Sequence, residues 1–423
     1  MPTYHLPYGS SKLPLNLPET ARVDWIEPAF IPAAPNQEQV VRDALAHPVD
    51  GQPLNALLAG KSVAIAVNDK TRPVPHDRII PPLIDALLDA GVHADDITFY
   101  IAVGTHLPMS PDEFSRILPQ SIINAYRIVS HDCDDQRNLV LLGETSAGTP
   151  IWANRRYFES DYKIVVGNIE PHHFAGFSGG YKTAAIGLAG RATITANHTM
   201  LAHPDARIAE ITANPLRKDI DEIGAALGVQ FALNVILNGD KDIIHAVSGS
   251  PTGVLRDGVP LSREACQIPN PGGRYDLVIA SAGGAPKDIN FYQAQKALSH
   301  ASLFARDGGV VILVAECKEG TGSLSYEEFM QDVHTTAEVF QKFHQQGFRV
   351  GPHKAFQVAR EAARLSIIMV SKIAPDKVAQ LLITPASNLD SAYQIACGLL
   401  SHASDSEPRT VILPRATNTI PVS

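Results

Sequence analysis

Long hydrophobic segments and basic clusters are missing from this 423-residue sequence. No window holds eighteen consecutive apolar residues, which argues against a membrane-spanning helix. The formal net charge is −9 and no long basic run is present, so we expect no nucleic-acid partner. The N-terminal segment lacks a basic region followed by an apolar core, the pattern of a secretory signal, and we therefore expect a cytoplasmic protein.

Cysteine is also scarce. The four cysteines are far apart and form no CxxC pair: Cys133, Cys266, Cys317 and Cys397. This spacing argues against a disulfide framework and against a thiolate metal site. We expect these residues to be small buried hydrophobic side chains.

What is present is a globular pattern, with 45% apolar and 19% charged residues over a length that suggests two domains. Short runs rich in Val and Ile predict buried strands at 62–67, 97–104, 162–167, 275–284 and 308–316. Amphipathic stretches predict helices at 78–91, 110–119 and 293–305. The alternation predicts an α/β fold with two domains built on mostly parallel sheets.

A proline- and glycine-rich segment at 267–275 is the best linker candidate. We expect an N-terminal α/β domain over 1–268 and a C-terminal one over 274–400. The tail, 401–423, holds one more strand-like run, TVIL, which can return to either domain, with the N-terminal domain as the first candidate. Polar motifs follow the predicted strands, and ligands of parallel sheets bind at the carboxyl ends of strands, so we expect the active site in the cleft between the domains.

The first two motifs follow the first two predicted strands. In NDKTRP, Arg72 can clamp a carboxylate or phosphate while Asp69 orients a ligand, or the two can simply pair on a surface turn stiffened by Pro73. In AVGTHLPMSPDEF, His106 would project from a strand exit, and a capping-box pattern starts the next helix. A single histidine at such a position is more often structural or merely exposed.

The third motif, PHHFAGFSGGYK, concentrates histidine, glycine and lysine at positions 171–182. Tyr181 stands where a P-loop needs its second glycine, which argues against a nucleoside triphosphatase. The amides of Gly179 and Gly180 can still bind a single phosphate, such as that of a mononucleotide cofactor. Lys182 can form a covalent bond to a cofactor, and His172 can transfer protons or bind a metal.

Two further motifs remain ambiguous on their own. His198 and His203 suggest zinc together with His172 or His173, but there is no HExxH and their spacing of five does not share a helical face. Tyr292 and Gln293 lie four and three residues before Lys296, so on a helix all three share one face. That face can bind a small anion, or it can be an ordinary solvated surface.

Together, in this order, the motifs resemble those of the nickel-dependent lactate racemase family over residues 60–300. The matching segments are DxTRP from Asp69, GTH ending at His106, PHHFAGFSGGYK, ANH ending at His198, and YQxxK from Tyr292 to Lys296. Each motif is weak alone, but five in the expected order are specific.

The resemblance implies a racemase or epimerase of a 2-hydroxy acid such as lactate. It implies a nickel-pincer nucleotide, a pyridinium-3-thioamide-5-thiocarboxylic acid mononucleotide that binds nickel. Lys182 would hold this cofactor covalently with Asp69 beside it, and His198 would ligate the nickel. Cofactor-biosynthesis enzymes would be needed for maturation.

The resemblance also implies catalytic roles. His106 and His172 would act as acid and base on opposite faces of the substrate, whose carboxylate or hydroxyl would be bound by Arg72, Tyr292, Gln293 and Lys296. Hydride transfer through a 2-keto acid avoids a carbanion, because the α-proton of a hydroxy acid is only weakly acidic.

The sequence departs from the family pattern in two places. Ile186 stands before Gly187 where the family often has proline, and the segment around GPHKAF does not align with the aromatic wall that the family places near the substrate. A cation there, Lys354 beside His353 and Phe356, would serve a second carboxylate, which makes malate or another larger 2-hydroxy acid a rival substrate.

Two different classes of protein also fit some of these motifs. One is a zinc hydrolase that uses His172, His198 and His203 as metal ligands. The second is a non-catalytic protein that binds a phosphorylated metabolite. The motifs carry no information on oligomeric state.

Overall fold

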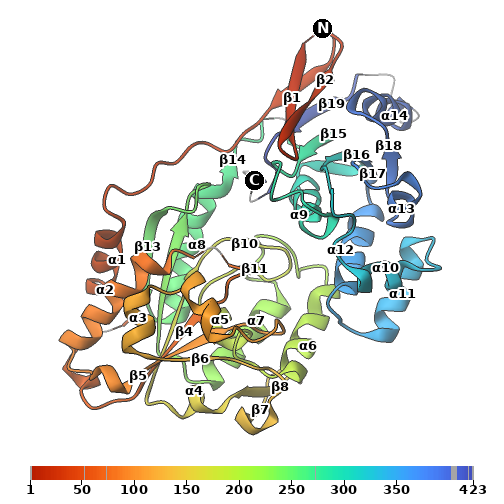
Figure 1. Cartoon of the computed structure of the whole chain (residues 1–423). Helices are drawn as coiled ribbons and strands as arrows, with labels where there is room; N and C mark the ends of the chain where they lie inside the picture. The colour runs from red at the N-terminus through yellow and green to blue at the C-terminus, as the bar shows by residue number, and fades with distance from the viewer. Residues whose placement is uncertain are drawn as a thin grey trace. The chain divides into compact units, whose positions relative to one another are not determined.

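Two six-stranded sheets organise the chain in a computed structural model (Figure 1), which describes residues 2–51, 53–72, 74–271, 273–401, 407–417 and 419–421. One sheet belongs to a unit of residues Phe30–Ala265, which we call the inserted unit. The other belongs to a unit that combines Met1–Ala29 with Cys266–Ser423, which we call the split unit. The predicted α/β fold with two domains and mostly parallel sheets is confirmed.

The sheet of the inserted unit is parallel except at one edge, where β13 runs antiparallel to β12. Its strand order is β13 (Ile243–Gly249), β12 (Phe231–Leu237), β9 (Tyr162–Asn168), β4 (Val63–Asn68), β5 (Ile97–Ala102) and β6 (Arg127–Ser130). The inner strands are buried along nearly their whole length, which explains why they appear in the sequence as continuous apolar runs.

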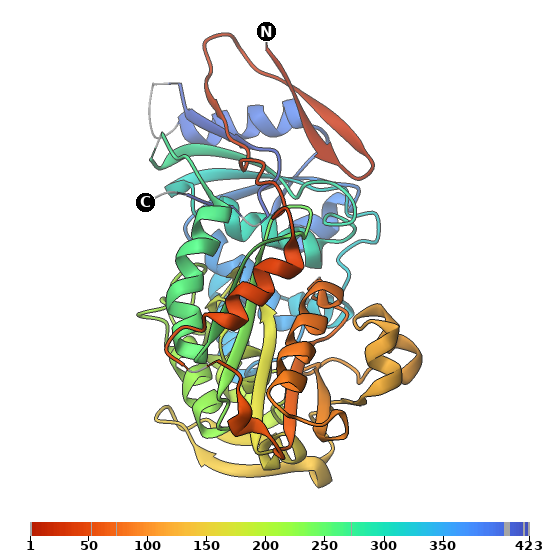
Figure 2. The ribbon, with the colours of Figure 1, turned by 90° about the vertical axis from the view of Figure 1, so that its left-hand side faces the viewer.

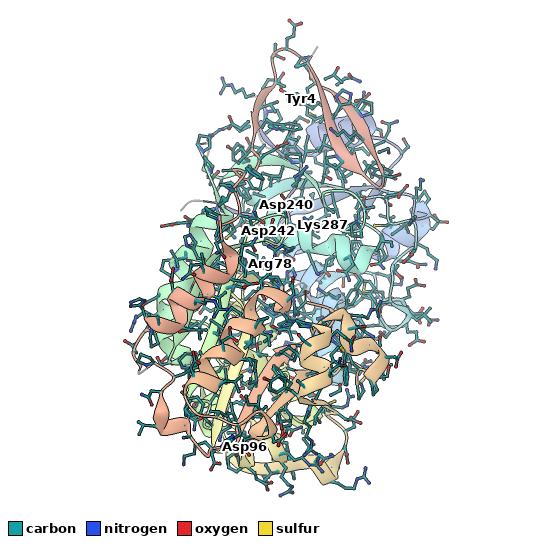
Figure 3. The ribbon with its side chains drawn as sticks, turned by 60° about the vertical axis from the view of Figure 1, so that its left-hand side comes forward. Tyr4, Arg78, Asp96, Asp240, Asp242 and Lys287 are labelled. Carbon is teal, nitrogen blue, oxygen red and sulfur yellow. The ribbon has the colours of Figure 1, made fainter. Side chains whose placement is uncertain are left out.

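Two helices, α1 (Gln37–Ala46) and α2 (His76–Asp89), pack on one face of this sheet. They run beside the strands in Figure 2. At the sheet edge, Arg78 of α2 forms an ion pair with Asp242 in the β12–β13 turn at 2.8 Å (Figure 3). The packing of apolar side chains supplies most of the stability here, since a half-exposed ion pair contributes little.

The remaining elements of the inserted unit are short and surround the strand ends. The hairpins are β7 (Leu139–Glu144) with β8 (Pro150–Asn154), and β10 (Pro171–His172) with β11 (Gly176–Phe177). The helices are α3 (Gln120–Ala125), α4 (Arg155–Glu159), α5 (Lys182–Ala185), α6 (Arg191–Thr199), α7 (Pro215–Ala226) and α8 (Pro251–Cys266). Helix α5 contacts β4 and β9. Lys182, the first residue of α5, therefore lies beside the sheet.

The sheet of the split unit is entirely parallel. Its order is β18 (Thr384–Ala386), β17 (Ser366–Val370), β16 (Ala305–Val314), β15 (Tyr275–Ser281), β19 (Arg409–Leu413) and β3 (Arg22–Trp25). One face is covered by the antiparallel hairpin of β1 (Thr3–Tyr8) and β2 (Ser11–Asn16) and by α14 (Leu389–Ser401).

Further helices of the split unit are α9 (Phe291–Ala301), α10 (Leu324–Met330), α11 (Thr336–Gln346), α12 (Pro352–Ala362) and α13 (Pro375–Gln380). Helix α9 contacts β15, β16 and α12. A short parallel pair joins β14 (Gln267–Ile268) to β20 (Ile420–Pro421).

The domain boundaries differ from the predicted 1–268, 274–400 and 401–423. Residues 1–29 belong to the split unit, because β3 hydrogen-bonds with β19 and the β1–β2 hairpin packs into the same core. The tail does not return to the N-terminal domain, because its TVIL run forms β19 between β15 and β3. Strand pairing between distant segments produces this arrangement, and local sequence patterns do not show it.

The predicted strands and two of the predicted helices correspond to observed elements, namely β4, β5, β9, β15, β16, α2 and α9. The helix predicted at 110–119 is wrong as an α-helix. Its capping box is present at Ser110 and Glu113, but the segment forms only a 3-10 helix over Pro111–Arg116. Phe114 is the one buried side chain of this segment, which leaves little packing to stabilise a longer helix.

Candidate active site

The loop that leads into α5 is a turn of two glycines, in a backbone conformation that other residues rarely adopt. Gly179 and Gly180 have φ values of +87° and +57°, a region that favours glycine. A Cβ on Gly179 would lie 2.6 Å from Cγ1 of Ile169, and Gly180 N–H donates to Oδ1 of Asn234 at 2.8 Å. The turn therefore determines where Lys182, the first residue of α5, is placed.

The ammonium group of Lys182 loses its proton more readily than that of an ordinary lysine. Desolvation by burial, followed by the guanidinium groups of Arg72 and Arg217, lowers the pKa of Lys182 to about 7, although Glu170 opposes this effect. About half of the side chains would be unprotonated near neutral pH. Because an unprotonated amine is a nucleophile, Lys182 is suited to forming a covalent bond.

A buried arginine holds the glycine turn in place. Arg217 of α7 donates from Nη1 to the carbonyl oxygens of Phe177 at 3.4 Å and Gly179 at 3.3 Å, and from Nη2 to Gly179 at 3.2 Å. Its charge is balanced by Asp221 at 2.8 Å. Arg217 was not predicted from the sequence, because a pair four residues apart is typical of an exposed helix face.

His172 lies on the short hairpin β10–β11, paired with Gly176. The backbone N–H of Ala175 donates to Nδ1 of His172 at 3.2 Å. Since a backbone amide can only donate, the proton of the neutral ring is on Nε2. Desolvation and then the charges of Lys182 and Arg72 hold the pKa of His172 well below its usual range.

His198, near the end of α6, has the opposite tautomer. Its Nδ1 lies 3.0 Å from Oδ1 of Asn197, whose amide nitrogen donates to Leu216 O at 3.1 Å and to Asp219 Oδ2 at 2.8 Å. These bonds identify Oδ1 as the acceptor, so His198 donates from Nδ1 and its lone pair is on Nε2. Desolvation and then Lys182 lower the pKa of His198 to about 3, which keeps the ring neutral.

His106 forms a dyad with Asp69. Nδ1 of His106 lies 2.7 Å from Oδ2 of Asp69, and Oδ1 of Asp69 accepts from Thr71 Oγ1 at 2.6 Å. Burial acts to raise the pKa of Asp69, but the hydrogen bonds from His106 and Thr71 outweigh it and hold the pKa below its usual value. Asp69 is therefore a carboxylate, and His106 has its lone pair on Nε2. This contact was not predicted from the sequence.

The His106 loop is also tied to the end of α5. Gly104 N–H donates to the carbonyl oxygen of Gly187 at 3.0 Å. A Cβ on Gly187 would lie 2.3 Å from Thr183 O, so this glycine, which follows Ile186, sits in a tight loop. Pro73 of the first motif lies outside the described residues.

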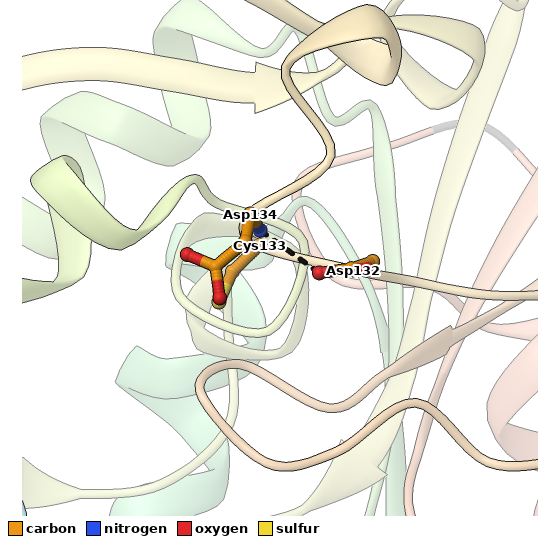
Figure 4. Close-up of side chains that lie close together, drawn as sticks. All are labelled: Asp132, Cys133 and Asp134. Carbon is orange, nitrogen blue, oxygen red and sulfur yellow. Dashed lines mark hydrogen bonds between the residues drawn. The ribbon is translucent and has the colours of Figure 1, made fainter.

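The charges of Lys182 and Arg72 lower the pKa of His172, so both lie close to it. The His172 ring lies 6.2 Å from that of His173, centroid to centroid, and the rings of His172 and His198 both pack against Phe174. His203 instead accepts from Asp205 N–H at 3.1 Å in the turn after α6. Within the described ranges, one trio of His, Cys or carboxylate atoms is close enough to share a metal: Asp132, Cys133 and Asp134 (Figure 4). The three histidines of the zinc hydrolase hypothesis do not form such a trio there.

In the split unit, α9 presents the predicted anion-binding face. Its N-cap is Asn290, whose Oδ1 accepts from Gln293 N–H at 3.1 Å. Of the eleven residues in α9, only Tyr292, Gln293 and Lys296 keep partial exposure. The sequence spacing of these three residues therefore corresponds to one shared face.

The chain matches known proteins over most of its length. The lactate racemase N-terminal domain matches residues 8–209, and the lactate racemase C-terminal domain matches residues 272–416. A lactate racemase of Lactiplantibacillus plantarum is 30% identical over 368 residues, which cover 85% of this chain and 86% of the relative. The chain belongs to the lactate racemase family.

A second relative, the lactate racemase of Thermoanaerobacterium thermosaccharolyticum, is 29% identical over 415 residues and covers 96% of each chain. The solved apoprotein structure from that organism has a TM-score of 0.90 at 27% identity and full coverage of both chains. A Thermotoga maritima protein of solved structure shares the fold, with a TM-score of 0.64 at 18% identity over 93% of this chain and 100% of that one. As a member of the lactate racemase family, the chain is an isomerase.

Two residues fit the cofactor that the lactate racemase resemblance implies. Lys182 offers an amine that is partly unprotonated, and His198 offers a neutral ring with its lone pair on Nε2, held by Asn197 through Nδ1. Metal-binding histidines commonly donate their second ring nitrogen in this way. Asn197 was not predicted from the sequence, because an asparagine beside a histidine carries no pattern of its own.

Membrane-spanning helices are not found in the part of this lactate racemase homologue that the structure describes. No helix there is both long enough and apolar enough to cross a bilayer.

Proposed function

We propose that this enzyme racemises or epimerises a 2-hydroxy acid, with His106 and His172 as its acid–base pair. The observation that carries the proposal is the cluster around His172. The charges of Lys182 and Arg72 lower its pKa, and the rings of His172 and His198 both pack edge-on against Phe174. Such a cluster combines a proton-transfer group, a metal ligand, a nucleophilic amine and a carboxylate-binding cation. The names of the relatives support lactate as the reference substrate.

His106 is suited to removing the hydroxyl proton of one enantiomer. The Asp69 carboxylate keeps the proton of the neutral ring on Nδ1, so Nε2 can accept a proton. The same carboxylate stabilises the imidazolium that results. Removal of this proton would accompany loss of hydride from the substrate's α-carbon, for which the bound cofactor would supply the acceptor, and the product would be a planar 2-keto acid.

His172 serves the other enantiomer. Its Nε2–H can donate to the substrate oxygen, whereas binding a second proton requires release of the Ala175 amide from Nδ1. Acylation of Lys182 removes one nearby positive charge, and a substrate carboxylate at Arg72 offsets another. Both changes would act to raise the pKa of His172 toward its usual range, against the effect of burial.

Lys182 and His198 would hold a nickel-pincer nucleotide, through a covalent thioamide and a nickel–imidazole bond respectively, with Gly179, Gly180 and Asp69 beside it. When bound, this group would supply a reversible hydride acceptor, which avoids a carbanion. Maturation would require cofactor-biosynthesis enzymes. Tyr292, Gln293 and Lys296 would bind the substrate's carboxylate or hydroxyl together with Arg72.

Intact mass spectrometry tests this proposal. Protein from a host that makes the cofactor is expected to carry a covalent adduct on Lys182 and about one nickel ion, and to interconvert the enantiomers of a 2-hydroxy acid. His106→Ala and His172→Ala should each abolish turnover and retain nickel. An unmodified Lys182 with stoichiometric zinc in that host would contradict the proposal, as would near-normal turnover of either histidine variant.

A further inference from the structure

Helices α9 and α12 of the split unit meet along a row of polar side chains, all buried except the partly exposed Tyr292. This polar seam consists of Tyr292 and Gln295 on α9 with His353, Lys354 and Gln357 on α12. Nε2 of Gln295 donates to Oε1 of Gln357 at 3.2 Å. The ring of His353 packs edge-on against Tyr292, with centroids 6.3 Å apart.

Lys354 places a buried positive charge in the seam. Only 5% of Lys354 and 7% of His353 are exposed. Nζ of Lys354 lies 5.2 Å from the centroid of the Tyr292 ring, a cation–π distance. Because Tyr292 belongs to the proposed substrate-binding face of α9, this charge lies next to that face.

The seam also contains an unused hydrogen-bond donor. Nε2 of Gln357 and Oε1 of Gln295 are buried and have no hydrogen-bond partner among the described residues. Buried polar atoms are nearly always paired, and an exception calls for a ligand or a water. Gln357 lies three residues after Lys354, which places the two side chains on neighbouring positions of one helix face.

The start of α12 is held rigidly. Gly351 has φ of +98°, and a Cβ there would lie 2.1 Å from Oγ of Ser325 on α10. Pro352 then begins the helix, with φ restricted by its ring. Lys354 is therefore positioned by packed secondary structure, as a specificity residue needs to be.

We propose that the polar seam binds a second carboxylate, so that the substrate is a 2-hydroxy dicarboxylate, such as malate or 2-hydroxyglutarate. This inference rests on the proposed function for its reacting end. Lys354 supplies the charge and Gln357 the neutral donor for the distal carboxylate. Lactate would place only a methyl group against these polar atoms, and sites built to bind a polar group discriminate strongly against analogues that lack it.

Substrate preference of the wild-type protein gives the first test. Nickel-loaded enzyme is assayed by chiral chromatography on the L-enantiomers of malate, 2-hydroxyglutarate, lactate and phenyllactate. We expect kcat/KM for one of the dicarboxylates to exceed that for lactate at least tenfold, a modest difference of about 1.4 kcal/mol. Calorimetry on the cofactor-free protein should show the same order of affinity with malate and lactate as probes.

Matched variants give the second test. Lys354→Met keeps the apolar stem and removes the charge, and we expect kcat/KM for the preferred dicarboxylate to fall about 100-fold, with a smaller loss for lactate. Gln357→Leu should shift the preference in the same direction. Lys342→Met is the control. Nζ of Lys342 also lies 5.2 Å from the centroid of an aromatic ring, that of Phe329. Unlike Lys354, it lies outside the polar seam, and it donates to the carbonyl oxygens of Phe329 and Gln331. The control should leave the dicarboxylate-to-lactate ratio unchanged.

Failure of this inference can be distinguished from failure of the proposed function. A loaded enzyme that prefers lactate or phenyllactate overturns the second-carboxylate site and leaves the racemase proposal standing. An unchanged ratio in folded Lys354→Met does the same. Tighter malate than lactate binding by the cofactor-free protein, together with a loaded enzyme that racemises none of the four acids, supports the seam and contradicts the proposed function.

Discussion

Nδ1 of His106 and Oδ2 of Asp69 are 2.7 Å apart, and the carboxylate is nearly fully buried while the imidazole is half exposed. This asymmetry matters because the buried Asp69 carboxylate is shielded from water, which therefore does not compete for the hydrogen bond that orients the His106 ring. The exposed side of His106 can then meet a ligand with Nε2 in its proton-accepting form. His172, whose Nδ1 accepts from Ala175, has the complementary tautomer.

Asp69→Asn should separate the role of the dyad from simple packing. An amide can donate to Nδ1 and so favour the wrong tautomer of His106, and we expect kcat to fall about 100-fold or more with nickel content unchanged. Thr71→Val removes the other side-chain bond to Asp69 and should cost much less. Steady-state kinetics with metal analysis checks this, and an Asp69→Asn enzyme with normal kcat would refute the dyad.

The reactivity of Lys182 should have an unusual pH dependence. Its pKa of about 7 predicts that acetylation of the cofactor-free protein at Lys182 is half-maximal near pH 7, rather than near the ordinary value of about 10.4. Peptide mapping after brief acetic anhydride pulses gives the profile, with surface lysines as internal references. Arg217→Met removes one of the charges that lower this pKa, so the midpoint should move to higher pH. A Lys182 profile that follows the surface lysines would contradict the prediction.

Nickel retention should depend on His198 and on the residue that orients it. We expect His198→Ala to lose nickel and Asn197→Ala to weaken nickel binding about 10- to 100-fold. His203→Ala, which removes a histidine of the same segment bonded to Asp205, should retain full metal content. Metal analysis after dialysis against a chelator checks all three. Loss of metal from His203→Ala would instead favour a multi-histidine site.

His76 should contribute to acid sensitivity. Burial lowers the pKa of His76 to about 4, although its Nδ1 contacts the Ile117 carbonyl oxygen at 3.0 Å. Between about pH 6.5 and 4 the unfolded chain binds a proton that the folded chain does not, so the free energy of unfolding falls by about 1.4 kcal/mol per pH unit as pH decreases. Urea unfolding of the cofactor-free His76→Leu variant at several pH values should show a correspondingly flatter decline. An unchanged slope would contradict the assignment.

The sequence predicted those parts of the fold that depend on local pattern. The inner strands were found because burial on both faces requires continuous apolar runs, as in β4 and β9. The place of β3 was missed, because pairing between Arg22–Trp25 and Arg409–Leu413 leaves no local signal. The helix after Ser110 was predicted to be too long, because a capping box marks where a helix starts and carries no information on its length.

For the site, the sequence showed the individual motifs. It did not show the contacts by which distant residues hold the site residues in place. Spacing alone placed Tyr292, Gln293 and Lys296 on one face, because helical periodicity is local. Arg217 and Asn197 act through contacts with segments far away in sequence, at Gly179 and Asp219. A single sequence contains no periodicity that reports such contacts.

The pairing of β3 with β19 also affects the order of events during synthesis. β3 is the first strand of its sheet to be made and β19 the last, with the whole inserted unit in between. The inserted unit can therefore complete its own sheet on the ribosome while the β3 segment still waits for its partner. A translation arrest before residue 409 should leave the inserted unit folded and β3 without β19, the strand that it pairs with.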